Sequence, residues 1–172
     1  DRWSVYGCKG VGIVSDDGSA NGKVLSLQKV DADYSAAAVW NFPSFASGTL
    51  KMRVRVQEPF QGATVMLSDN FSSPFDTQDV YFCDYKLVLT TGKAGGDEVS
   101  LPADKWSELE LRWDGAKRIC RVMLDGKEVT TLPLLQQSPG ASYLRVRCNA
   151  MYPEKGRVLI DSVEMNGVHS TE

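Results

Sequence analysis

The sequence is poor in the residues that most often carry chemistry. It contains one histidine, His169, and none of its four cysteines stands in a C-x-x-C pair. Zinc sites draw on clustered cysteine and histidine ligands, so we expect none. Ser-His-Asp or Cys-His catalysis would have to use His169, which we expect to lie in a frayed tail. No glycine-rich loop with the spacing of a phosphate-binding motif follows a strand and opens a helix, so nucleotide binding is not indicated.

Strong charge and long apolar runs are also missing. The net charge is −3, from 19 basic and 22 acidic residues, whereas a nucleic-acid-binding domain is normally strongly basic. The longest apolar runs, such as Ala36 to Trp40, are too short to cross a membrane. The 172 residues suffice for a proper core, because a domain of this size buries roughly 70% of the surface of its unfolded chain. We therefore expect one domain over residues 1–172, with no nucleic-acid partner and no membrane span.

Short β-rich runs separated by turn signals are abundant instead. Turn dipeptides such as Asn21-Gly22, Asp114-Gly115 and Asp125-Gly126 supply the positive φ that tight hairpins require. No stretch of a dozen residues has a period of 3.6, which favours a sandwich over a parallel α/β sheet. The predicted strands are Val11–Ser15, Val24–Gln28, Ala36–Phe42, Thr49–Gln57, Ala63–Ser68, Val80–Leu89, Glu98–Leu101, Trp106–Trp113, Arg118–Leu124, Glu128–Leu132, Tyr143–Asn149 and Arg157–Met165.

Several strands show one apolar and one polar face. In Leu50–Gln57, leucine, methionine and valine alternate with Lys51, Arg53, Arg55 and Gln57. Side chains alternate across a strand, so this pattern predicts one buried and one solvated face. Cys120 and Cys148 fall in phase with core residues, which is compatible with buried free thiols or with a disulfide. The sequence thus predicts an all-β, two-sheet antiparallel sandwich.

The order of three segments carries a family resemblance. The segment Trp106 to Gly115 has two tryptophans seven residues apart, and Asp-Gly follows the second one. The next hairpin reads V-x-L-D-G-x-x-V from Val122, and the segment Arg157–Met165 contains I-D-x-V. This order resembles the concanavalin A-like lectin/glucanase superfamily, the jelly rolls that include laminin G-like modules. The resemblance implies an extracellular or periplasmic accessory module, attached to a secreted glycan-degrading or cell-surface protein. Its partners would be an oligo- or polysaccharide and the other domains of the parent protein.

The outward residues of the alternating strands are the candidate ligand-binding set. Arginine forks pair bidentately with carboxylate or sulfate, and aromatic rings stack on sugar faces, so this set would suit an acidic glycan. The alternative is a solvated sheet face with cross-strand Arg–Glu pairs. If the strands share one sheet, these residues stand together on one face, with Arg121, Trp106 and Asn149 nearby. The set comprises Arg53, Arg55, Arg112, Tyr143, Arg145 and Arg147.

Two enzyme alternatives depend on few residues. Glu108 and Glu110 are two apart on one strand, so they share a face, as the paired carboxylates of a retaining glycosidase must. Jelly-roll glucanases carry three alternating acids with an aspartate in the middle, but here the series reads Glu108, Glu110, Arg112. Jelly-roll lyases use a Q-I-H element that has no match in this sequence. We therefore assign no catalytic residue and keep Glu108 and Glu110 as the runner-up pair.

Asp161 falls in an apolar series with Leu159, Val163 and Met165. A buried carboxylate must be paired, hydrogen-bonded or metal-bound. In related sandwiches this position sometimes holds a structural Ca²⁺, for which loop residues Asp16, Asp17 and Asn21 could add oxygen ligands. The alternative is an aspartate at a bulge or strand end that accepts backbone N–H bonds.

Loop aromatics are the last candidates. Phe71, Phe75 and Tyr152 stand in irregular segments, where they could form a sugar platform, contact a partner, or fold back over the sandwich. The expected function is a non-catalytic carbohydrate-binding or accessory module. The alternatives are a domain-packing or protein-interaction module and a jelly-roll glycoside hydrolase.

Overall fold

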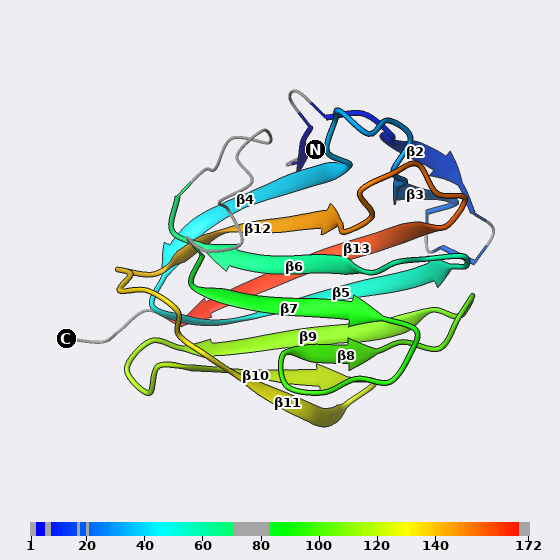
Figure 1. Ribbon diagram of the computed structural model, residues 1–172. Coiled ribbons are helices and arrows are strands. Elements are labelled where there is room, and N and C mark those ends of the chain that lie inside the picture. Colours follow the sequence, from blue (N-terminus) through cyan, green and yellow to red (C-terminus); the bar gives the residue numbers. More distant parts are fainter. Residues whose placement is uncertain (1–2, 6–7, 17, 20, 71–82, 169–172) are drawn as a thin grey trace.

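The computed structural model is a sandwich of two β-sheets, and the part of the chain it describes contains no helix (Figure 1). The structure describes residues 3–5, 8–16, 18–19, 21–70 and 83–168. Neighbouring strands are antiparallel except for one parallel pair, β7 and β8. No helix in this described part is long and apolar enough to cross a membrane.

The first sheet has six strands in the spatial order β1-β4-β12-β6-β7-β8. β12 lies near its middle, between β4 and β6, and every residue of β6 is buried. The strands are β1 (Trp3–Ser4), β4 (Ala37–Phe45), β6 (Ala63–Ser68), β7 (Tyr85–Thr90), β8 (Glu98–Ser100) and β12 (Ala141–Cys148).

The second sheet has seven strands in the order β11-β10-β9-β5-β13-β3-β2. Its centre is the long antiparallel pair of β5 and β13, with β9 on the other side of β5. The strands are β2 (Val11–Ser15), β3 (Lys23–Leu27), β5 (Ser47–Gln57), β9 (Ser107–Asp114), β10 (Ile119–Leu124), β11 (Lys127–Pro133) and β13 (Arg157–Val168).

The core fills the space between the inner faces of the two sheets. The apolar set predicted for Leu50–Gln57 points inward, and each member is at most 1% exposed. Full burial of a leucine, valine or methionine side chain contributes about 1.5–3 kcal/mol, so this single face is a large share of the driving force. The core residues of the central strands are Leu50, Met52, Val54, Val56, Leu109, Leu111, Trp113, Leu144 and Val146.

The structure confirms the predicted fold class. All twelve predicted strands are present, although β7 begins at Tyr85 and residues 80–82 lie outside the described part. β4 continues past Pro43 to Phe45, beyond the predicted end at Phe42, and the two-residue β1 was not predicted. Cys120 and Cys148 are buried free thiols, and neither of them forms a disulfide.

Candidate functional site

The predicted arginine set is divided between the two sheets. Arg53 and Arg55 lie on β5 and Arg112 lies on β9, all on the outer face of the seven-stranded sheet. β12, with Tyr143, Arg145 and Arg147, belongs to the six-stranded sheet. The condition that these strands share one sheet is therefore not met, because alternation tells which side chains point outward but not which sheet a strand joins.

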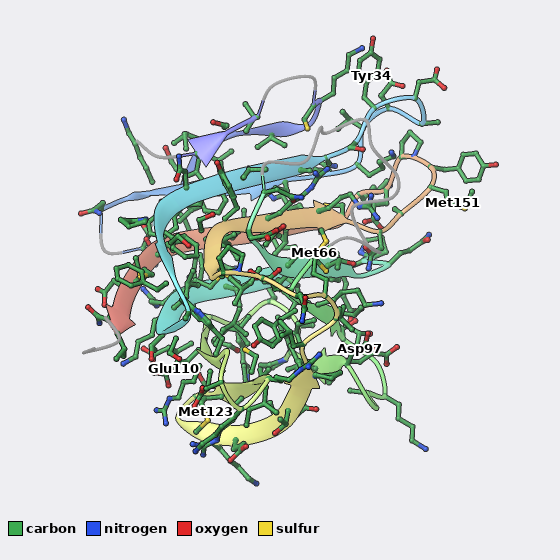
Figure 2. The ribbon with its side chains drawn as sticks, turned by 90° about the vertical axis from the view of Figure 1, so that its left-hand side faces the viewer. Tyr34, Met66, Asp97, Glu110, Met123 and Met151 are labelled. Carbon is green, nitrogen blue, oxygen red and sulfur yellow. The ribbon has the colours of Figure 1, made fainter. Side chains whose placement is uncertain are left out.

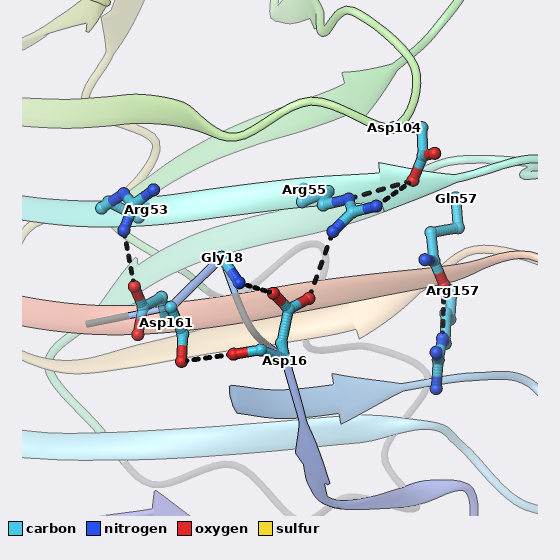
Figure 3. Close-up of polar contacts among 9 residues, drawn as sticks. Asp16, Gly18, Arg53, Arg55, Gln57, Asp104, Arg157 and Asp161 are labelled. Carbon is cyan, nitrogen blue, oxygen red and sulfur yellow. Dashed lines mark hydrogen bonds and ion pairs between the residues drawn. The ribbon is translucent and has the colours of Figure 1, made fainter. Parts of the chain in front are cut away.

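Arg53 and Arg55 are held by acidic side chains from three other segments (Figure 3). Arg53 Nη1 donates to Asp161 Oδ2 at 2.7 Å, and its guanidinium lies 5.1 Å from the ring centroid of Trp106. Arg55 donates to Asp104 Oδ1 at 2.9 and 2.6 Å and to Asp16 Oδ2 at 3.2 Å. These contacts connect β5 to β13 and to the loops before β3 and β9, so both arginines serve the fold.

Asp161 lies at a β-bulge. The register between β13 and β5 shifts between Ile160 and Val163, which breaks the predicted alternation of Asp161 with Leu159 and Val163. The carboxylate is 1% exposed and pairs with the guanidinium of Arg53. The bulge was one of the expected settings for this residue, but the arginine partner was not foreseen.

The calcium prediction involved the same carboxylate and loop residues. Asp16 accepts hydrogen bonds from the backbone N–H of Gly18 at 2.7 Å and from Arg55, while Asp17 lies outside the described residues. Within the described ranges, no three His, Cys, Asp or Glu side chains are grouped for a metal ion. Calcium binding at Asp161 stays a prediction, and its test is given in the Discussion.

Glu108 and Glu110 both lie beside cations on the outer face of the seven-stranded sheet. In the register of β5 and β9, Glu108 is opposite Arg53 and Glu110 is opposite Lys51. Glu110 also accepts a hydrogen bond from Arg112 at 2.9 Å, with its side chain only 8% exposed. Glu110 therefore has an electrostatic role in the sheet, and the runner-up catalytic pair stays a prediction.

Arg145 is buried, although its strand alternates as predicted. It is 3% exposed, and its cross-strand neighbours Met66 and Val39 are 1% and 6% exposed. Tyr143 and Arg147, on the same side of β12, are half-buried. This side of the six-stranded sheet is therefore covered at Arg145, and a ligand in solution could not reach that guanidinium without displacing protein.

A different surface presents an accessible aromatic ring. Tyr152, in the loop between β12 and β13, is 71% exposed, and it is the only exposed aromatic residue in the part of the chain that the structure describes. Met151 beside it is 73% exposed, and Val30 in the β3–β4 loop is 47% exposed. We call these three residues the Tyr152 surface. Tyr152 was a candidate from the sequence and does not fold back, whereas Phe71 and Phe75 lie outside the described residues.

Hydrogen bonds hold the two loops of this surface together. The N–H of Glu154 donates to the Lys29 carbonyl at 3.0 Å, and Gln28 Nε2 donates to the Glu154 carbonyl at 3.0 Å. The Glu154 carboxylate also accepts a hydrogen bond from the N–H of Gln61 in a third loop, and partial burial raises the pKa of this carboxyl. The Tyr152 surface therefore lies on loops that are hydrogen-bonded to one another. Because these loops are already ordered, binding a ligand costs less conformational entropy.

Tyr34 lies at the same end of the molecule as Met151 (Figure 2). Its ring is half-buried, and one face is covered by the Lys9 ammonium at 3.9 Å from the centroid. Lys9 in turn pairs with Asp31 at 3.3 Å. Tyr34 therefore has one face occupied already, and Tyr152 is the ring of this end that offers an open stacking face.

No protein-family model and no curated protein sequence matches the chain. Solved structures do match it. A sialidase has a TM-score of 0.73 at 15% identity, over 96% of this chain and 17% of the sialidase chain. This chain thus spans a small part of that protein's length.

Two further structures match over most of both chains. The potassium-bound carbohydrate recognition domain of Emp46p has a TM-score of 0.61 at 11% identity, over 98% of this chain and 90% of the other. The cellulose-induced protein Cip1 has a TM-score of 0.62 at 10% identity, over 96% and 90%. Identities this low speak for the fold alone, and together with the two sheets they show that the chain has the concanavalin A-like jelly-roll fold.

Proposed function

We propose that this protein is a non-catalytic carbohydrate-binding module and that it holds a saccharide on the Tyr152 surface. The observation that carries the proposal is the 71% exposed ring of Tyr152 on loops fixed by hydrogen bonds. An aromatic ring offers a large, rigid apolar area at low conformational cost, and its hydroxyl supplies a polar contact at the edge. Exposed Met151, the neighbour of Tyr152 in the chain, extends the apolar area.

The structural matches support the carbohydrate-related part of this proposal. The matching proteins include a carbohydrate recognition domain, a sialidase and a cellulose-induced protein. A fold alone does not determine function, so the proposal depends on the ring and its surroundings. As in many glycan-binding modules, the setting we propose is extracellular or periplasmic, within a longer glycan-active or cell-surface protein.

The test is a glycan array probed with the wild-type protein, Tyr152→Ala and Tyr152→Phe. We expect the wild type to bind a defined glycan class, Tyr152→Phe to retain most of this binding because the ring remains, and Tyr152→Ala to lose it. Leu135→Ala is the matched control, since Leu135 is an exposed apolar residue, 47% accessible, that is not part of the Tyr152 surface. Equal binding by Tyr152→Ala and the wild type would refute the assignment of this surface.

A second function, docking of a neighbouring domain of a longer polypeptide, is favoured by one specific observation. Inner-face residues of the edge strand β2 are not fully covered, and Ile13 is 65% exposed. With Val5, 40% exposed, and Trp3, Ile13 lines a groove of about 680 Å³. If the groove is open in the isolated protein, it should bind a hydrophobic dye such as anilinonaphthalene sulfonate, and Ile13→Asp should remove this binding. An absence of dye binding by the wild type would refute docking at this groove.

A further inference from the structure

A small groove crosses the outer face of the seven-stranded sheet, far from the Tyr152 surface. It encloses about 250 Å³ and is lined by residues of β5, β9, β10 and the end of β13. The Tyr152 loop precedes the first residue of β13, Arg157, and the groove contacts its last residue, Val168. Twelve residues of strand separate the two ends by roughly 35 Å at ~3.3 Å per residue. One saccharide unit cannot contact both surfaces.

The groove contains two arginines directly opposite each other. In the register of β9 and β10, Arg112 is paired with Arg121, and their side chains are 44% and 45% exposed. Like charges directly opposite on neighbouring strands destabilise a sheet. Thr49 is opposite Arg112 on β5, and Thr131 is opposite Arg121 on β11, so a polar row crosses four strands.

Both arginines keep N–H donors that their ion pairs do not use. Arg112 donates from Nη2 to Glu110 at 2.9 Å, and Arg121 donates from Nε and Nη2 to Glu128 at 3.1 and 2.8 Å. A guanidinium carries five N–H donors, so several remain on each side chain. The glutamates hold the two arginine side chains in place and leave other N–H donors available to a ligand.

Lys117 adds a third cation to the groove. Its side chain is exposed, and no ion pair to it is found among the residues that the structure describes. The nearby Asp114 carboxylate is engaged by the turn, because its Oδ1 accepts hydrogen bonds from the N–H groups of Ala116 and Lys117. Ile119 and Val168, the latter 62% exposed, add an apolar lining.

We propose that this groove, which we call the Arg112 groove, binds the carboxylate or sulfate of an acidic glycan. Arg112 and Arg121 donate to the oxyanion, and Lys117 neutralises it. Guanidinium forks match the planar geometry of oxyanions, and a bound anion would relieve the repulsion between the two arginines. The net charge of −3 disfavours nucleic acid as the source of the anion. The groove stands apart from the Tyr152 surface, and only the choice of a glycan as the polymer rests on the proposed function.

The experiment titrates the protein calorimetrically with three polymers of known charge: dextran sulfate, polygalacturonate and uncharged dextran. We expect at least one of the two acidic polymers to bind and dextran to bind much more weakly. Binding of dextran sulfate alone would identify sulfate as the ligand, and binding of polygalacturonate alone would identify carboxylate. Indistinguishable titrations with all three polymers would overturn the proposal.

Two variants test the residues. The double variant Glu110→Gln/Arg112→Gln removes the Arg112 cation together with the carboxylate that pairs with it, so no glutamate is left without its partner. It should weaken acidic-polymer binding by about tenfold, equivalent to about 1.4 kcal/mol. Lys117→Gln changes an exposed residue without a described ion pair and should weaken it by a smaller factor without altering the melting temperature. Lys93→Gln, an exposed cation in the β7–β8 loop, is the matched control and should bind as the wild type does.

The outcomes separate this inference from the proposed function. Tyr152→Ala should leave acidic-polymer binding unchanged. If Lys93→Gln weakens acidic-polymer binding as much as Lys117→Gln does, the attraction is diffuse and electrostatic. This result would refute binding at the Arg112 groove. Equal competition by a DNA duplex would also refute a glycan site. If array glycans bind through Tyr152 but neither acidic polymer binds, the groove proposal fails and the proposed function stands.

Discussion

The ion pair of Arg53 and Asp161 gives the sharpest stability prediction. The Asp161 side chain is 1% exposed and that of Arg53 is 36% exposed. Removing one partner of a fully buried pair costs about 3–5 kcal/mol. Here the arginine reaches the surface, so water can partly replace it, and we expect Arg53→Met to lower the free energy of unfolding by about 2 kcal/mol, within the range for a hydrogen bond to a charged group.

A double-mutant cycle isolates this interaction. Arg53→Met/Asp161→Asn removes both charges and should cost less than the sum of the single variants by about 1–2 kcal/mol, because no unpaired carboxylate is then left in the sheet. Urea unfolding followed by tryptophan fluorescence measures all three variants. Arg121→Met is the control, since the pair of Arg121 with Glu128 is 45% and 40% exposed and should contribute little to stability. A cost below about 0.5 kcal/mol for Arg53→Met, or additive costs in the double variant, would show that Asp161 does not depend on this arginine.

Burial raises the pKa of the Asp84 carboxyl above its ordinary 3.8, so the folded state keeps this proton to higher pH than the unfolded chain. Stability should therefore fall as pH rises through the folded-state pKa, and Asp84→Asn should flatten this decline in melting temperatures measured from acid to neutral pH; an unchanged profile would contradict it. Burial raises the pKa values of Cys120 and Cys148 to about 12, so neither thiol should react with Ellman's reagent in the native protein, whereas both should react in urea. The calcium prediction for Asp161 is tested with EDTA: a drop in melting temperature that Ca²⁺ reverses would confirm it, and an unchanged melting temperature would show that Arg53 alone satisfies this carboxylate.

The strands could be predicted because burial of one strand face makes apolar and polar residues alternate along the sequence. Leu50, Met52 and Val54 are in the core, as their alternation with charged residues requires. Sheet membership could not be predicted in this way, since β12 alternates like β5 but joins the other sheet. A bulge such as the one at Asp161 depends on pairing between distant segments, so the aspartate in an apolar series indicated a bulge only as one of several settings.

The burial of Arg145 did leave a signal in the sequence. Its neighbours β4 and β6 include the continuous apolar runs Ala37 to Trp40 and Val65 to Leu67, a pattern typical of strands buried on both faces. Those runs indicate that the outer face of this sheet is covered, and therefore that its arginine is too. The exposure of Tyr152 had no such signal, because periodicity says nothing about side chains in a loop.

In our proposal this jelly roll binds a saccharide through Tyr152 without cleaving it. The most direct measurement is calorimetric titration of the wild-type protein and Tyr152→Ala with the strongest glycan from the array, with reducing-sugar release followed in the same samples. We predict saturable binding by the wild type, loss of binding in Tyr152→Ala, and no release of sugar. Saturable binding that survives in Tyr152→Ala, or release of reducing sugar by the wild type, would contradict the claim and return attention to Glu108 and Glu110.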